Sequence, residues 1–108
     1  MGKVYNKLVR DNIPDIIRSK GENPIIKILD DIEYKKELEN KLLEEYKEVI
    51  ETTTSEERIE ELADIYEIIK ALANLENKNI EDIAKVANEK CEKRGGFNNK
   101  IYLEKVTD

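Results

Sequence analysis

The stretch EELADIYEIIKALANL, residues 60–75, decides the fold because its apolar residues recur at helical spacing on two adjacent stripes. The first stripe steps alternately by four and three residues and comprises Glu61, Ile65, Ile68, Leu72 and Leu75. The second comprises Leu62, Tyr66, Ile69 and Ala73. A helix with so wide an apolar surface is expected to be central and largely buried. Glu61 is the exception, since it holds a position that later turns fill with Ile and Leu, and Asp64 lies beside it.

Capping signals place further helices around this stretch. Three pairs of residues have the spacing of an N-cap and the third residue of a helix: Asp30 with Glu33, Thr54 with Glu57, and Asn79 with Asp82. They predict long helices over about residues 31–52, 55–76 and 80–94, the last ending at a Gly-Gly pair.

The two ends of the chain are less regular. Asn12, Pro14 and Gly21 favour a short helix in NIPDIIRSKG, residues 12–21, as its cap, its first turn and its end. The segment 24–29, PIIKIL, is a short strand candidate that could pair with the weakly alternating tail 100–106 as a small β ribbon.

The length and composition fit one domain over residues 1–108. The chain has 108 residues, a net charge of -6 and 39% hydrophobic residues. These values favour a single domain. The long predicted helices make it mainly α, and we expect them to pack as an antiparallel helical bundle. A chain this short leaves apolar surface exposed, so further burial in a homo-oligomer is expected.

Several classes of function are excluded by what the chain lacks. It has no histidine, which removes Ser-His-Asp triads, imidazole bases and histidine-rich zinc sites. Its one cysteine, Cys91, cannot form an internal disulfide, and its apolar runs are too short to cross a membrane, so we expect a cytoplasmic protein. The acidic charge argues against binding to polymeric nucleic acid.

Carboxylates border the apolar stripe of the preceding helix, in KLLEEYKEVI, residues 41–50. On a helical wheel Glu45 flanks the stripe, Glu48 lies one step further and Glu44 faces away. Glu45 and Glu48 are therefore expected to face Glu61 and Asp64 across an antiparallel helix pair.

Carboxylates in such a place need neutralising, by protonation, by Lys or Arg, or by a divalent cation. Oxygen ligands suit Mg²⁺ or Mn²⁺. The alternative is that these acids are ordinary residues at the rim of the helices, which for Glu61, near a helix N-terminus, is favourable in itself.

Two pairs of cations could meet this charge or hold phosphate oxygens. Lys90 and Arg94 lie on or beside the apolar stripe of the last predicted helix. Lys7 and Arg10 lie in KLVRD, residues 7–11, which is either a surface loop or a second element that contacts phosphate. For Lys90 and Arg94 the alternative is snorkelling at a helix C-terminus.

These motifs together resemble a known family. EEYKE, residues 44–48, followed by EELAD, residues 60–64, resembles the paired Glu-x-x-Glu and Glu-x-x-Asp motifs of MazG-like all-α nucleoside triphosphate pyrophosphohydrolases. Lys90 and Arg94 match the basic residues of that family's next helix. The opening YNKLVRDNIPDII, residues 5–17, and RGGF, residues 94–97, are similar to a subgroup described as phosphoribosyl-ATP pyrophosphohydrolase-like.

The resemblance implies an oligomeric helical bundle that cleaves a nucleotide between its α and β phosphates to a monophosphate and pyrophosphate. It implies Mg²⁺, or Mn²⁺, on four ligands: Glu45, Glu48, Glu61 and Asp64. Glu45 or Glu48 would act as general base. The expected phosphate-binding residues are Lys90, Arg94, Lys7 and Arg10. Two other readings stay open: a non-catalytic helical assembly module, and a metal-dependent hydrolase of another phosphorylated metabolite.

Overall fold

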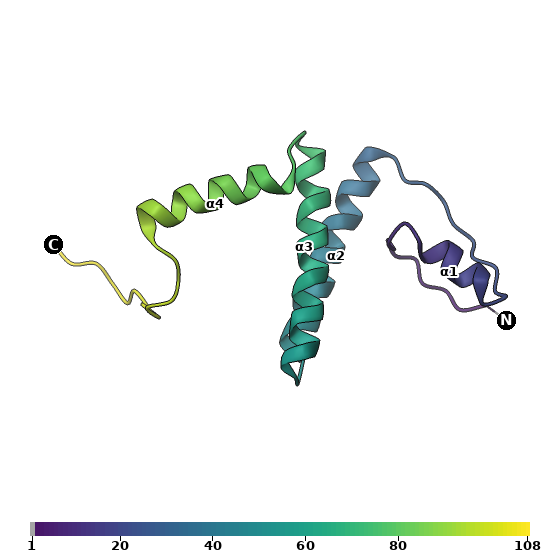
Figure 1. Cartoon of the computed structure of the whole chain (residues 1–108), viewed down its shortest axis with the longest axis horizontal. Coiled ribbons are helices and arrows are strands. Elements are labelled where there is room, and N and C mark those ends of the chain that lie inside the picture. The colour runs from purple at the N-terminus through teal and green to yellow at the C-terminus, as the bar shows by residue number, and fades with distance from the viewer. Residues whose placement is uncertain (1) are drawn as a thin grey trace.

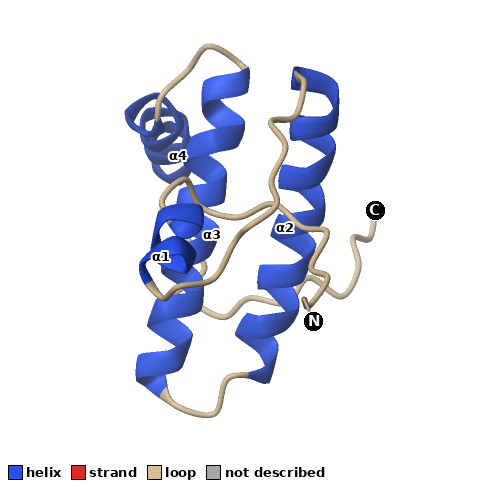
Figure 2. Ribbon diagram, turned by 90° about the vertical axis from the view of Figure 1, so that its right-hand side faces the viewer, coloured by secondary structure: helices blue, strands red, loops and turns tan. Residues whose placement is uncertain are grey.

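The computed structural model describes residues 2–108, and every regular element within them is a helix. The elements are α1 (Ile13–Ser19), α2 (Asp31–Glu51), α3 (Ser55–Leu75) and α4 (Ile80–Arg94) (Figure 1). The two long helices α2 and α3 pack side by side and antiparallel, and we call this pair the helical hairpin (Figure 2). The prediction of a mainly α helical fold is confirmed.

The three capping signals form as the sequence predicts. The side chains of Asp30 and Thr54 accept hydrogen bonds from the third backbone N–H of α2 and α3, at 2.8 and 3.1 Å. Asn79 and Asp82 form a reciprocal capping box at 2.9 and 3.0 Å. Because these bonds are local, the three long helices start where the sequence places their caps, and they end within one residue of their predicted ends.

The expected β ribbon is wrong for the residues that the structure describes. Segments 24–29 and 100–106 carry no strand, and they lie on opposite sides of the helical hairpin (Figure 1). Their apolar side chains are open to solvent, as Ile25 shows with 95% exposure. An isolated pair of short strands is only marginally stable, so weak alternation alone does not form one.

The N-terminal helix is present but its cap differs from the prediction. α1 has Pro14 in its first turn and ends just before Gly21, which has a left-handed φ of 82°. The side chain of Asn12, however, makes no capping hydrogen bond. With seven residues and no buried side chain, α1 is a minor element.

The core is small and lies between α2 and α3. Its buried apolar side chains are Leu38, Ile68 and Ala73. The expectation that residues 60–75 are largely buried is wrong for the first half of the second stripe, where Leu62 and Tyr66 are 45% and 53% exposed, whereas Ala73 at its end is buried. The reason is that α4, which could cover this stripe, meets α3 only near the corner between them and then projects away (Figure 1).

The chain as a whole is extended. It exposes 10178 Å², whereas a compact 12.6 kDa protein exposes about 6,200 Å². Its radius of gyration is 18.5 Å, against about 13 Å for a compact domain of this length. None of the described helices has the length and apolar character needed to traverse a lipid bilayer.

Candidate metal and phosphate site

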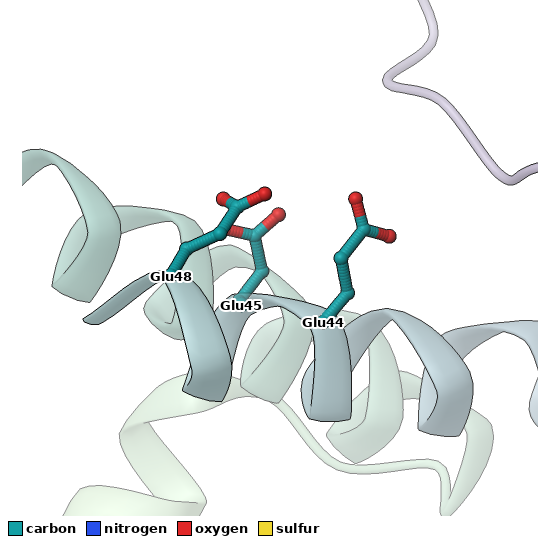
Figure 3. Close-up of side chains that lie close together, drawn as sticks. All are labelled: Glu44, Glu45 and Glu48. Atoms are coloured by element: carbon teal, nitrogen blue, oxygen red, sulfur yellow. The ribbon is translucent and has the colours of Figure 1, made fainter. Parts of the chain in front are cut away.

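Five carboxylates gather on one side of the helical hairpin, and we call them the acidic cluster: Glu44, Glu45 and Glu48 from α2, and Glu61 and Asp64 from α3. They form two overlapping triads, Glu44–Glu45–Glu48 and Glu45–Glu61–Asp64. In each triad, one oxygen from each residue lies within 4.8 Å of the others. Figure 3 shows the three α2 side chains pointing to the same side of the helix.

The structure therefore brings together the four acids that the sequence singles out. They do so because residues three apart share a helix face, which holds for Glu45 with Glu48 and for Glu61 with Asp64. The antiparallel packing of α2 on α3 then sets these two faces against each other (Figure 2).

Glu45 is the centre of the acidic cluster, since it belongs to both triads. The residue is only 5% exposed. Its Oε2 atom and the Oε2 atom of Glu61 are buried and accept no hydrogen bond. Burying a carboxylate oxygen without a partner is costly, so this pair of atoms requires a proton or a cation that the chain itself does not supply.

The pKa values of these two groups reflect that deficit. Burial, hydrogen bonding to the Glu61 and Glu48 carboxyl groups, and the charges of Glu48 and Asp64 raise the pKa of Glu45 to about 8. A hydrogen bond with Glu45 lowers the pKa of Glu61, but Glu48, burial and the charge of Asp64 together raise it further, so the net shift is upward. Burial and the neighbouring acids therefore favour the protonated, neutral form of both groups.

Three cations approach the acidic cluster from within the chain. Lys41 Nζ lies 3.6 Å from Glu44 and 3.9 Å from Glu45. Arg10 Nη2 donates to Asp64 Oδ1 at 2.5 Å, and Lys7 Nζ lies 3.7 Å from Glu44 Oε1. The sequence prediction placed Lys7 and Arg10 near the site but missed Lys41, although its spacing of three and four residues from Glu44 and Glu45 signals the pairs.

The expectation that Glu44 faces away from the other acids is wrong. Its side chain is 37% exposed, pairs with Lys7 and Lys41, and shares a triad with Glu45 and Glu48. Glu44 and Glu48 are four residues apart and so lie on the same face. The angle of a residue from the apolar stripe does not show which acids on the helix lie close to one another.

The expected inward direction of Lys90 and Arg94 is also wrong within a single chain. Both lie near the end of α4, which points away from the helical hairpin (Figure 1). They line a separate hollow of about 460 Å³ with Cys91, Gly95 and Phe97. No described residue of α4 is buried, so the stripe that was read as an inner face has nothing packed along most of its length.

A hard divalent cation fits the acidic cluster. All its donors are carboxylate oxygens, which Mg²⁺ and Mn²⁺ prefer. The two buried Oε2 atoms of Glu45 and Glu61 lack any other partner. Glu45, Glu61 and Asp64 would hold the ion, and Glu48 adjoins them through the second triad.

The comparisons with known proteins are narrow. No family model and no solved structure matches the chain. One relative, an uncharacterized protein of Mycolicibacterium smegmatis, is 43% identical over 54 residues. The match covers 50% of this chain and 55% of the relative, so the chain spans about half the length of that protein.

Proposed function

We propose that this protein is a Mg²⁺-dependent nucleotide pyrophosphohydrolase of the cytoplasm. It would cleave the bond between the α and β phosphates of a nucleoside triphosphate, or of a related nucleotide such as phosphoribosyl-ATP, to a monophosphate and pyrophosphate. The observation that carries the proposal is the pair of buried, unpartnered Oε2 atoms of Glu45 and Glu61, set within two overlapping triads of carboxylates. Mn²⁺ would serve in place of Mg²⁺.

Different members of the acidic cluster would bind the ion and accept a proton. Glu45, Glu61 and Asp64 form the triad that spans the two helices and would hold the ion. When bound, the ion supplies positive charge to the phosphates and makes a water molecule more acidic. Glu45 or Glu48 would accept the proton of the attacking water.

The cations of the chain provide phosphate binding from two directions. Lys7 and Arg10 already stand at the edge of the acidic cluster. Lys90 and Arg94 lie too far along α4 to join them in the same chain (Figure 1). A second copy of the chain, packed with its α4 over the helical hairpin, would bring them to the site, where they would balance the charge of the phosphates.

This homo-oligomer is supported by the surface that one chain leaves open. The exposed area exceeds that of a compact monomer by about 4,000 Å². The second stripe of α3 meets the start of α4 in an apolar hollow of about 280 Å³, lined by Tyr66, Ile69 and Ile83 among others. Obligate dimers bury total areas of about 2,000–5,000 Å², so the excess is enough for a stable dimer or tetramer.

A substrate panel tests the proposed reaction. Nucleoside triphosphates, their deoxy forms and phosphoribosyl-ATP are incubated with the protein and Mg²⁺, and pyrophosphate and monophosphate are quantified. We expect equal amounts of both products from at least one nucleotide, and none with EDTA. Release of inorganic phosphate in place of pyrophosphate would contradict cleavage between the α and β phosphates.

A non-catalytic assembly module is the second candidate. The observation that favours it is that Lys41, Arg10 and Lys7 already pair with members of the acidic cluster. In that case the acids are structural, Mg²⁺ leaves the melting temperature unchanged, and Glu61→Leu is neutral or stabilising. Stabilisation by Mg²⁺ together with a nucleotide would exclude it.

A further inference from the structure

The segment before α1 is fixed to the helical hairpin through charge. Residues 2–12 form no helix or strand, and we call them the N-terminal strap. Two ion pairs join the strap to the hairpin, Lys7 with Glu44 on α2 and Arg10 with Asp64 on α3. Among the described helices, close packing is confined to α2 with α3 and α3 with α4, so α1 does not dock the strap.

Both ion pairs end on the acidic cluster rather than on other acids of the surface. Glu44 belongs to one triad and Asp64 to the other, so the two cations of the strap hold opposite edges of the cluster. Figure 3 shows the purple N-terminal part of the chain on the side toward which the α2 carboxylates point. The strap therefore lies against the side of the hairpin that carries the acidic cluster.

A divalent cation and the strap compete for the same carboxylate, that of Asp64. Asp64 Oδ1 accepts from Arg10, and the triad of Glu45, Glu61 and Asp64 needs an oxygen of that carboxylate for an ion. An ion in the triad would also repel the nearby guanidinium. Both partners of the Arg10–Asp64 pair are partly exposed, so the pair is weak enough to exchange.

We propose that Lys7 and Arg10 act as internal counterions of the metal-free acidic cluster, and that a divalent cation displaces them and releases the N-terminal strap. The inference rests on the proposed metal site and adds a consequence for its ligands. Once freed, the two cations remain beside the acidic cluster and are available to an anionic ligand of the ion. Binding of the metal and binding of a phosphate are then coupled.

The proposal predicts opposite signs for two affinities. Arg10→Gln removes a competitor for Asp64, so Mg²⁺ should bind about two- to fivefold more tightly, the range expected for losing one exposed ion pair. The same variant should bind a nonhydrolysable nucleoside triphosphate more weakly, because a cation for its phosphates is gone. Arg18→Gln is the matched control, since Arg18 pairs with Asp15 on α1.

Release of the strap has its own readout, independent of activity. The chain has no tryptophan, so Tyr5→Trp, at an exposed position of the strap, places a single tryptophan there, whose fluorescence can be excited apart from that of the tyrosines. Its fluorescence anisotropy should fall when Mg²⁺ binds. With Arg10→Gln added, it should be low from the start and insensitive to Mg²⁺. The measurement on Tyr5→Trp alone does not depend on the folding of any charge variant.

The outcomes separate the two proposals. If calorimetry shows Mg²⁺ binding without any change in Tyr5→Trp anisotropy, the proposed release of the strap is wrong, whereas the proposed metal site is retained. Unchanged or weaker Mg²⁺ binding by Arg10→Gln, with helicity retained, also overturns the strap. Absence of Mg²⁺ binding at millimolar concentration overturns the metal site and the strap together.

Discussion

The helical hairpin and α4 are both amphipathic, but only the hairpin uses its apolar face within the chain. α2 and α3 bury Leu38, Ile68 and Ala73 against each other and hold the acidic cluster in place. α4 has a complete capping box and a comparable apolar stripe, yet buries no residue. Caps and apolar periodicity are therefore enough to form a helix. Whether that helix can hold a site in place depends on a second element that packs on its apolar face.

The largest effect is expected from the hairpin itself. Glu61→Gln removes a charge from the triad that would hold Mg²⁺, so the rate of pyrophosphate release should fall by more than about a hundredfold. Mg²⁺ should no longer raise the melting temperature. Glu60→Gln, on the exposed neighbouring position, is the control. Full activity of Glu61→Gln would remove the metal site from the hairpin.

A smaller effect, on one function alone, is expected from α4. Arg94→Ala should lower the rate by about a hundredfold, the lower end of the range for loss of one charge-stabilising donor, while Mg²⁺ still raises the melting temperature. Equal mixing with Glu61→Gln should restore about a quarter of wild-type activity, because one of two shared sites in the mixed dimers is intact. Failure to restore activity after subunit exchange would argue against a site shared between copies.

The pH dependence of stability isolates the buried centre of the hairpin. The pKa of Glu45 is about 8 in the folded chain and about 4.5 in the unfolded one. The folded state binds more protons between these values, so the metal-free protein should lose stability as pH rises from about 4.5 to about 8, on the order of a few kcal/mol.

Urea unfolding in EDTA at pH 5 and pH 8.5 measures this loss. Glu45→Gln should flatten the dependence, whereas Glu39→Gln, an exposed acid of α2, should keep it. Stability that rises with pH in the wild type would contradict the assignment.

The smallest effect compares two caps. Thr54→Ala removes the cap of α3 and should lower the stability of the hairpin by about 1 kcal/mol. Asn79→Ala removes the cap of α4. In the monomer it should reduce helicity by circular dichroism without moving the urea midpoint of the hairpin, because α4 packs so little. An equal shift in both variants would mean that α4 is covered in solution, as the oligomer requires.

The sequence predicted what local geometry determines. Caps at Asp30, Thr54 and Asn79 depend on residues three apart, and the meeting of Glu45 with Glu61 follows from the helical period and an antiparallel turn. The direction of α4 depends instead on a corner in which Asn77 adopts a left-handed φ of 59°. No periodic pattern encodes that angle.

The cations show the same division. Lys41 was predictable from its spacing, but the reach of Arg10 to Asp64 was not, because an irregular segment has no period from which to place it. An apolar stripe such as that of α4 indicates only that another element should pack against it. Whether that element belongs to the same chain or to another copy depends on how the protein assembles.

The three-residue connection between α2 and α3 also has a consequence for the order of folding. Residues 52–54 join the two helices, whereas the Arg10–Asp64 pair closes a span of 54 residues. Short loops close at lower entropic cost and local contacts form sooner. The hairpin is therefore expected to bring its carboxylates together before Arg10 pairs with Asp64. Protons or Mg²⁺ would neutralise these carboxylates at that stage and should speed refolding.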